Sequence, residues 1–112
     1  MYHALLIDDD SAHAERLTRR VLQPLTLVVE HVRRLDEAMM RLQHHTNPYA
    51  LVIVNVSVNV FPWFRALQRL QHACLRVNSQ AVTLFLCVSK TQKETDFILR
   101  IEHMGARFVY ER

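Results

Sequence analysis

Six polar residues that could bind a metal ion or a phosphoryl group follow apolar segments of this chain. They are Asp8, Asp9, Asp10, Asn55, Ser89 and Lys90. The three aspartates are adjacent, and adjacent carboxylates repel one another unless a cation balances their charge. Mg²⁺ prefers oxygen ligands of this kind. The pattern therefore predicts a cation site, unless residues 8–11 serve only to cap a following helix.

Apolar runs of strand length alternate along the chain with segments of helical periodicity. The expected strands cover residues 4–7, 25–32, 50–54, 81–88 and 107–110. The expected helices cover a segment that starts at Asp10 or Ser11 and ends before Pro24, and residues 36–42, 62–74 and 91–104. Strands that alternate with helices of this length form a parallel sheet through right-handed crossovers. Ligands of such sheets bind at the carboxyl ends of the strands, where the six polar residues are expected to lie.

An alternative interpretation extends the third strand beyond Asn55. Valines alternate strictly with polar residues from Val54 to Val60, which is typical of a strand with one polar face. Under this interpretation Asn55 belongs to the polar face of a longer strand and has no role in a site. Both interpretations remain open from the sequence.

Length and composition indicate one globular domain over residues 1–112. Apolar residues make up 50% of the chain and charged residues 22%, and the net charge is +3 without a compact basic stripe, so nucleic-acid binding is not indicated. No apolar run approaches the roughly 18 residues of a membrane span, and no signal peptide is recognisable. We therefore expect a cytoplasmic protein. Cys74 and Cys87 are interpreted as small buried residues rather than a disulfide or metal pair.

Three motifs resemble those of response-regulator receiver domains, the CheY-like domains of two-component signalling. Residues 6–10 resemble the acidic motif after the first strand of that family, and residues 51–55 resemble the strand that ends in its phosphorylated aspartate. Gly105 and Ala106 resemble the pair that leads into its fifth strand. The resemblance covers nearly the whole chain. It implies a flavodoxin-like, three-layer α/β fold with a five-stranded parallel sheet of order 2-1-3-4-5.

The same resemblance implies roles for individual residues. Asp8 and Asp9 match the positions that hold Mg²⁺, and Asn55 matches the phospho-acceptor position and would add a neutral oxygen to the metal site. Ser89 matches the residue that contacts the phosphoryl group, although its spacing to Gly105 is one residue longer than usual. Phe108 falls near the aromatic switch position, where ordinary core packing is the alternative interpretation.

The departures from the family pattern determine the functional prediction. Asn55 replaces the aspartate, and a carboxamide is not a nucleophile toward a phosphoryl donor. It also removes one charge from the metal site, so we expect weak or vestigial Mg²⁺ binding. Glu111 replaces the lysine near the end of the fifth strand and would repel a phosphoryl group. These departures predict a pseudo-receiver that is not an enzyme, requires no cofactor and signals through a protein partner or an output domain.

Two other functions remain as alternatives. The aspartates could belong to a haloacid-dehalogenase-type phosphatase, with Asp8 as nucleophile and Asp10 as acid/base. That family's pattern requires Thr or Val in place of Ala12 and a later acidic pair, which residues 87–90 do not provide. The second alternative is an α/β domain that binds a small ligand at the acidic strand ends.

The last helix of the receiver fold is expected to be missing or very short, because the chain stops just after its fifth strand. Apolar side chains of the strands at residues 81–88 and 107–110 would then face water. A second copy of the chain could cover them through a two-fold interface. The sequence therefore predicts self-association, with a homodimer through the face of the fourth and fifth strands. Trp63 is expected to lie near the acidic site.

Overall fold

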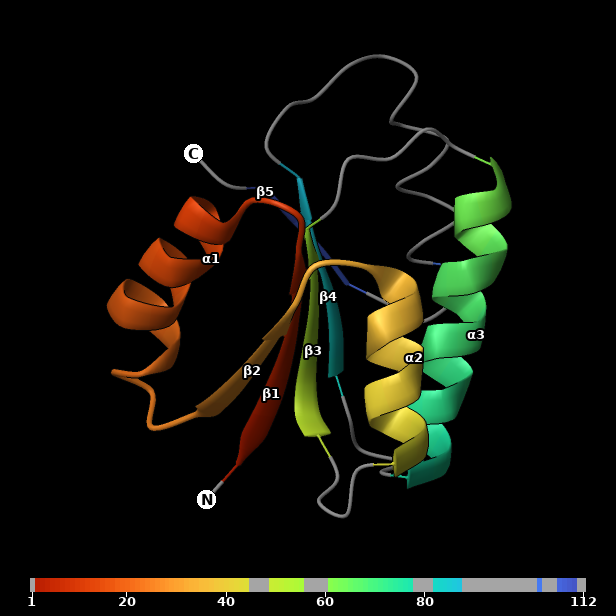
Figure 1. Cartoon of the computed structure of the whole chain (residues 1–112), viewed down its shortest axis with the longest axis horizontal. Coiled ribbons are helices and arrows are strands. Elements are labelled where there is room, and N and C mark those ends of the chain that lie inside the picture. The colour runs from red at the N-terminus through yellow and green to blue at the C-terminus, as the bar shows by residue number, and fades with distance from the viewer. Residues whose placement is uncertain are drawn as a thin grey trace.

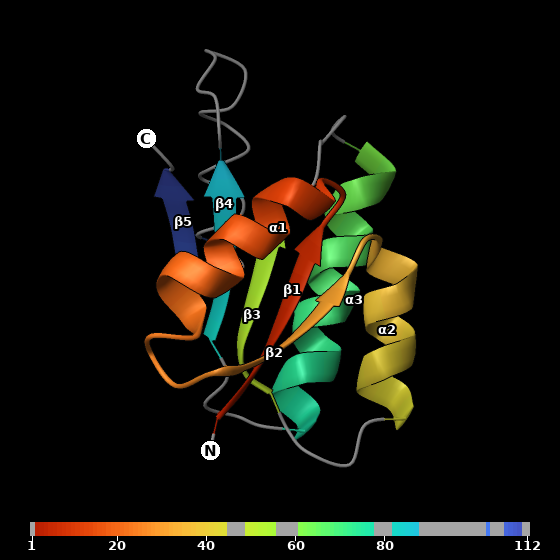
Figure 2. The ribbon, with the colours of Figure 1, turned by 60° about the vertical axis from the view of Figure 1, so that its left-hand side comes forward.

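The structure is a computed structural model that describes residues 2–44, 49–55, 61–77, 82–87, 103 and 107–110. Its strands are β1 (His3–Asp8), β2 (Val28–Val32), β3 (Tyr49–Asn55), β4 (Val82–Cys87) and β5 (Arg107–Tyr110). They form one parallel sheet of order β2-β1-β3-β4-β5, as the sequence predicts. The carboxyl ends of the strands all lie at the same edge of the sheet (Figure 2).

Helices cover both faces of the sheet and make three layers (Figure 1). Helix α1 (Ser11–Leu17) continues into a π-helical turn, η1 (Thr18–Leu22), and lies on one face. Helices α2 (Leu35–His44) and α3 (Phe61–Val77) lie together on the other face. This is the flavodoxin-like α/β arrangement expected from the strand and helix order.

The core divides into two clusters because successive side chains of a strand point to opposite faces of the sheet. Leu5 and Ile7 of β1 pack in the cluster beneath α2 and α3, whereas Leu6 packs in the cluster beneath α1. On β3, Ile53 joins Leu6 in the α1 cluster, and Val54 joins the α2/α3 cluster. This alternation decides which helix faces the residues that end β1 and β3.

Several element boundaries differ from the predicted ones. The second strand starts at Val28 and not at residue 25, because residues 22–27 form a turn in which Thr26 has a positive φ of 62°. The third helix extends to Val77, three residues past the predicted end, with Pro62 in its first turn as expected. Strand β3 ends at Asn55, and residues 56–60, which the longer-strand alternative requires, lie outside the described residues.

The predicted helix over residues 91–104 also lies outside the described residues, apart from His103. In the part of the chain that the structure does describe, no helix is long and apolar enough to cross a membrane.

Candidate functional site

The candidate site is centred on Asp8, the last residue of β1. The register of the two central strands places Asp8 directly beside Asn55, the last residue of β3. Side-chain alternation puts Asp8 on the same face as Leu6, and Asn55 on the same face as Ile53, which is the face that α1 covers. Asp8 is fully buried, with 0% of its surface exposed, and Asn55 is half-buried. The two side chains therefore lie side by side at the carboxyl edge of the sheet, and the metal and phospho-acceptor roles predicted for them stay predictions.

Asp8 accepts hydrogen bonds on both carboxylate oxygens. The backbone N–H of Asp10 donates to Oδ1 at 2.9 Å, and the Asn55 Nδ2 group donates to Oδ2 at 3.1 Å. A buried carboxylate is costly unless donors replace the water that it loses. The amide of Asn55 supplies such a donor, whereas a carboxylate at the same position would face Asp8 as a second negative charge.

The ring of His13 completes the cluster from the first turn of α1. Asp10 caps this helix, and its Oδ1 accepts the backbone N–H of His13 at 3.1 Å. The cap fixes the first turn so that His13 Nδ1 lies 2.5 Å from Asp8 Oδ2. The His13 side chain is only 13% exposed. Sequence reasoning missed His13, because this residue belongs to none of the motifs that the sequence singles out.

The separation of 2.5 Å assigns the proton between His13 and Asp8. Two lone pairs would repel each other at this distance, so one hydrogen lies between the two atoms, and we assign it to His13 Nδ1, which then donates to Asp8. Asn55 Nδ2 lies 3.0 Å from the same ring nitrogen, which therefore has no lone pair to offer it. The Asn55 amide accordingly donates to Asp8, and two donors converge on the single oxygen Oδ2.

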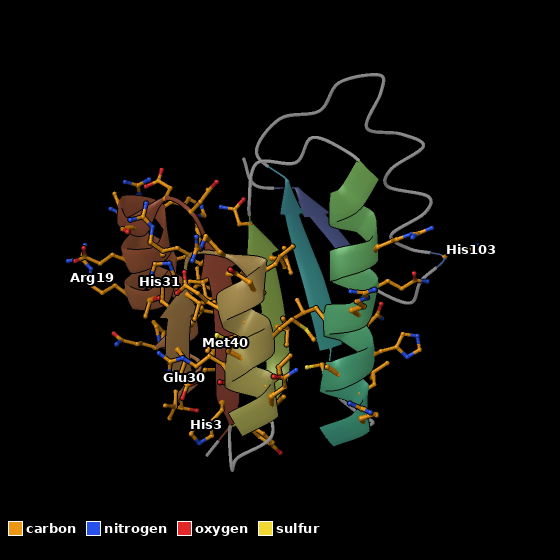
Figure 3. The ribbon with its side chains drawn as sticks, turned by 45° about the vertical axis from the view of Figure 1, so that its right-hand side comes forward. His3, Arg19, Glu30, His31, Met40 and His103 are labelled. Carbon is orange, nitrogen blue, oxygen red and sulfur yellow. The ribbon has the colours of Figure 1, made fainter. Side chains whose placement is uncertain are left out.

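Two further side chains hold the backbone that follows β1. His31 Nε2 contacts the backbone carbonyl oxygen of Asp8 at 2.8 Å. An Arg33 Nη atom donates to the backbone carbonyl oxygen of Asp9 at 3.1 Å. Both residues come from β2 and the turn after it, and Figure 3 shows His31 far from His3, at the other end of the sheet. These contacts act on main-chain oxygens and do not reach the Asp8 carboxylate.

The remaining aspartates of the acidic motif differ from Asp8 in environment. Asp9 is exposed, so the structure does not bury it with Asp8 and Asn55. Asp10 is the helix cap, and the hydrogen bond from the His13 backbone N–H holds the pKa of its carboxyl below the ordinary value. The alternative that the motif caps the helix is therefore correct for Asp10, and Asp8 has a different role.

Several of the predicted site features lie wholly or partly outside the described residues. Ser89 and Glu111 belong to segments that the structure does not describe, as do Gly105 and Ala106. The backbone of Phe108 is described and pairs in register with Phe85 of β4. Trp63 lies in the first turn of α3. The side chains of Phe108 and Trp63 fall outside the description, so their predicted roles remain predictions.

The contacts of Asp8 do not fit a bound Mg²⁺. A ligating oxygen must turn a lone pair toward the cation at about 2.0–2.1 Å, whereas Asp8 Oδ2 is approached by two nitrogen donors. Asn55 also turns its Nδ2, and not its oxygen, toward Asp8. Among the described residues there is no group of three or more His, Cys, Asp or Glu side chains that could hold a metal ion.

Comparisons with known proteins identify the fold. No protein-family model and no curated protein sequence matches the chain. Solved structures do match. A two-component response regulator from Clostridium difficile gives a TM-score of 0.74 at 14% identity, over 99% of this chain and 82% of that one. The chemotaxis protein CheY4 of Vibrio cholerae gives 0.70 at 18% identity, over 99% of this chain and 85% of that one.

A third match comes from a histidine kinase in complex with a response regulator protein, with a TM-score of 0.70 at 15% identity, over 100% of this chain and 87% of that one. All these identities are low, so the similarity concerns the three-dimensional fold. The chain has the CheY-like fold of response-regulator receiver domains, as its acidic and third-strand motifs predict. Asn55 lies at the end of the third strand, where the sequence motif places the phospho-acceptor position.

Proposed function

We propose that this chain is a receiver-like signalling domain that works without phosphorylation at residue 55 and transmits its signal by binding a protein partner. The observation that carries the proposal is the hydrogen bond from Asn55 Nδ2 to the buried Asp8 carboxylate. An amide nitrogen has no lone pair available for attack on phosphorus. Asn55 is thus a structural donor at the place where the receiver fold otherwise uses a nucleophile.

The state of Asp8 supports the same proposal and argues against the phosphatase alternative. A nucleophilic carboxylate needs an accessible oxygen within reach of the substrate. Asp8 is fully buried and accepts three hydrogen bonds, and Asp10, the acid/base of that alternative, is engaged as a helix cap. We therefore propose that the domain is not an enzyme, and that it needs no metal ion for its fold or its signal.

The direct test is incubation of the purified chain with acetyl phosphate and Mg²⁺, followed by intact-mass measurement at neutral pH. We expect no added phosphate. A labile phosphoryl group on Asp8, Asp9 or Asp10 would contradict the proposal. A generic aryl phosphate offered with Mg²⁺ should likewise remain uncleaved, whereas turnover that is lost in Asp8→Asn would establish the phosphatase alternative.

The partner is expected to be a protein, and a second copy of the chain is our first candidate. One of the similar structures is a response regulator in complex with a histidine kinase. On the α1 face, α1 and η1 cross in front of the sheet and pass over the lower parts of β4 and β5, whereas the carboxyl-terminal parts of these two strands extend beyond the described helices (Figure 2). The sequences of these two strands, VTLFLC and RFVY, are mostly apolar. We propose a homodimer through this face, in a cytoplasmic protein.

Light scattering at micromolar concentration tests the dimer. We expect the mass of two chains for wild type. Leu84→Glu or Val109→Glu should reduce this mass toward that of one chain. Leu75→Glu, on the exposed surface of α3, is the matched control and should keep the mass of two chains. A monomer that binds no hydrophobic dye would refute the proposed dimer and its exposed apolar face on β4 and β5. That result would not affect the proposal that residue 55 is not phosphorylated, which the mass measurement tests separately.

A further inference from the structure

We infer that the imidazole ring of His13 takes the place of a cation beside the carboxylate of Asp8 and the amide of Asn55, the site that we call the acidic pocket. Removal of this ring then opens the site to Mg²⁺. The inference rests on the proposed function, because it concerns the same site. It goes further by assigning the loss of metal binding chiefly to His13, a residue outside the acidic motif, rather than to the missing charge at Asn55.

The first step of the argument is the position of the ring. His13 Nδ1 lies 2.5 Å from Asp8 Oδ2, which is the oxygen on the side of Asn55. Asn55 Nδ2 lies 3.0 Å from the same ring nitrogen. A cation shared by the ends of β1 and β3 would have to bind this oxygen, between the two side chains. The Nδ1–H group of His13 is already there.

The second step is the direction of the hydrogen. The N–H group of His13 Nδ1 directs its positive end toward the carboxylate. Its hydrogen occupies a lone pair of Asp8 Oδ2 that a metal ion would need. A cation would have to displace this hydrogen bond before it could bind. Hydrogen bonds to a charged group are strong enough that this competition should weaken cation affinity about tenfold or more.

The third step is the support that holds the ring in place. The Asp10 cap fixes the first turn of α1 through the His13 backbone N–H at 3.1 Å. The His13 side chain is largely buried, with 13% of its surface exposed. A side chain that is buried in a fixed turn loses little further freedom when it forms its hydrogen bond. His13 is therefore a persistent occupant of the pocket.

The experiment is a Mg²⁺ titration of the ¹⁵N-labelled full chain, which follows the backbone amides of Asp9 and Asp10 and the side-chain amide of Asn55. Wild type should show no saturation in the low millimolar range. His13→Ala should bind Mg²⁺ about tenfold tighter or more, because the competing hydrogen bond is gone. His31→Ala is the matched control, since His31 contacts only the backbone oxygen of Asp8 and should behave as wild type.

A second pair of variants separates the ring from the missing charge. Asn55→Asp alone should improve Mg²⁺ binding less than the double variant His13→Ala/Asn55→Asp. Equal affinity in wild type and His13→Ala, whether both bind or neither binds, would overturn the inference, as would equal affinity in Asn55→Asp and the double variant. None of these results depends on phosphate uptake, which is the separate test of the proposed function.

A measurement on the wild type covers the case in which His13→Ala fails to fold. Long-range ¹H–¹⁵N correlation spectra of the histidine rings report which ring nitrogen carries a hydrogen. We expect a hydrogen on His13 Nδ1, and its signal should be unchanged by added Mg²⁺. A His13 ring with no hydrogen on Nδ1, or one whose Nδ1–H is lost when Mg²⁺ is added, overturns the inference without any substitution.

Discussion

Replacement of Asp8 by asparagine should destabilise the fold. The sign of this effect distinguishes a site in which hydrogen bonds satisfy the Asp8 carboxylate (closed) from one in which the carboxylates are free to bind a cation (open). In an open acidic pocket without a cation, one neutralised carboxylate relieves repulsion and stabilises the protein. Here the Asp8 carboxylate accepts hydrogen bonds from Asp10, His13 and Asn55 while fully buried. Asp8→Asn keeps the shape of the side chain but changes one acceptor into a donor.

The magnitude follows from the three contacts. Whichever way the new amide lies, its NH₂ group must face at least one N–H donor, so at least one hydrogen bond to a charged acceptor is lost. Such a bond contributes about 1.5–3 kcal/mol. The remaining bonds weaken because their acceptor becomes neutral, and the lower desolvation of an amide offsets part of the loss. We expect a net loss of about 2–3 kcal/mol, which is a fall in Tm of about 8–12 °C for a domain of this size.

Urea and thermal unfolding followed by far-UV circular dichroism measure this loss without added metal. Asp9→Asn is the matched control, because its side chain is exposed and surface substitutions usually change stability by less than about 0.5 kcal/mol. An Asp8→Asn protein as stable as wild type, or more stable, would refute the hydrogen-bonded pocket and would point to an open acidic site.

Three further predictions concern groups around the site and in the core. Tyr49→Phe should cost about 1–2 kcal/mol, because a buried hydroxyl that donates to the Glu30 carboxylate is lost. Burial raises the pKa of Tyr49 above its ordinary 10.0. The contribution of its hydroxyl to the free energy of unfolding is therefore complete below pH 10.0 and declines at higher pH. Urea unfolding at alkaline pH should show this decline in wild type but not in Tyr49→Phe. Asp10→Ala should lower Tm through loss of the helix cap. Because the pKa of Asp10 lies below 3.8, the contribution of the cap to stability is present above that pH and disappears on further acidification, so the difference in Tm between wild type and variant should shrink there. Burial raises the pKa of the Cys74 thiol to about 11, so alkylation at neutral pH should modify Cys74 only after unfolding, as peptide mapping can test.

Most of the fold was predictable because its signals are local. The buried central strands appear as continuous apolar runs, and the segments between them carry helical periodicity, which together imply a parallel α/β sheet. The start of the second strand was not predictable in the same way. Residues 25–27 are as apolar and β-branched as a strand, but the positive φ of Thr26 belongs to a turn. The residue types alone do not predict a backbone conformation that the surrounding turn imposes.

The candidate site was predictable only in part. The meeting of Asp8 and Asn55 follows from the parallel register of β1 and β3, which the apolar runs imply. The role of His13 depends on the direction of its ring. A combination of two signals could have found it. Alternation places Asp8 and Asn55 on one face, and His13 lies in the first turn of the helix that covers that face, three residues after the Asp10 cap.

Asn55 and His13 together change what the carboxyl edge of this sheet requires. With an aspartate at residue 55, two carboxylates would face each other at adjacent strand ends, and a cation would be needed to balance them. With asparagine, the same register brings a donor to Asp8, and His13 adds a second donor to the same oxygen. The buried charge is then satisfied by the chain itself. Under the proposed function, a signal that passes through this domain would therefore change what binds to its surface and not the chemistry of this site.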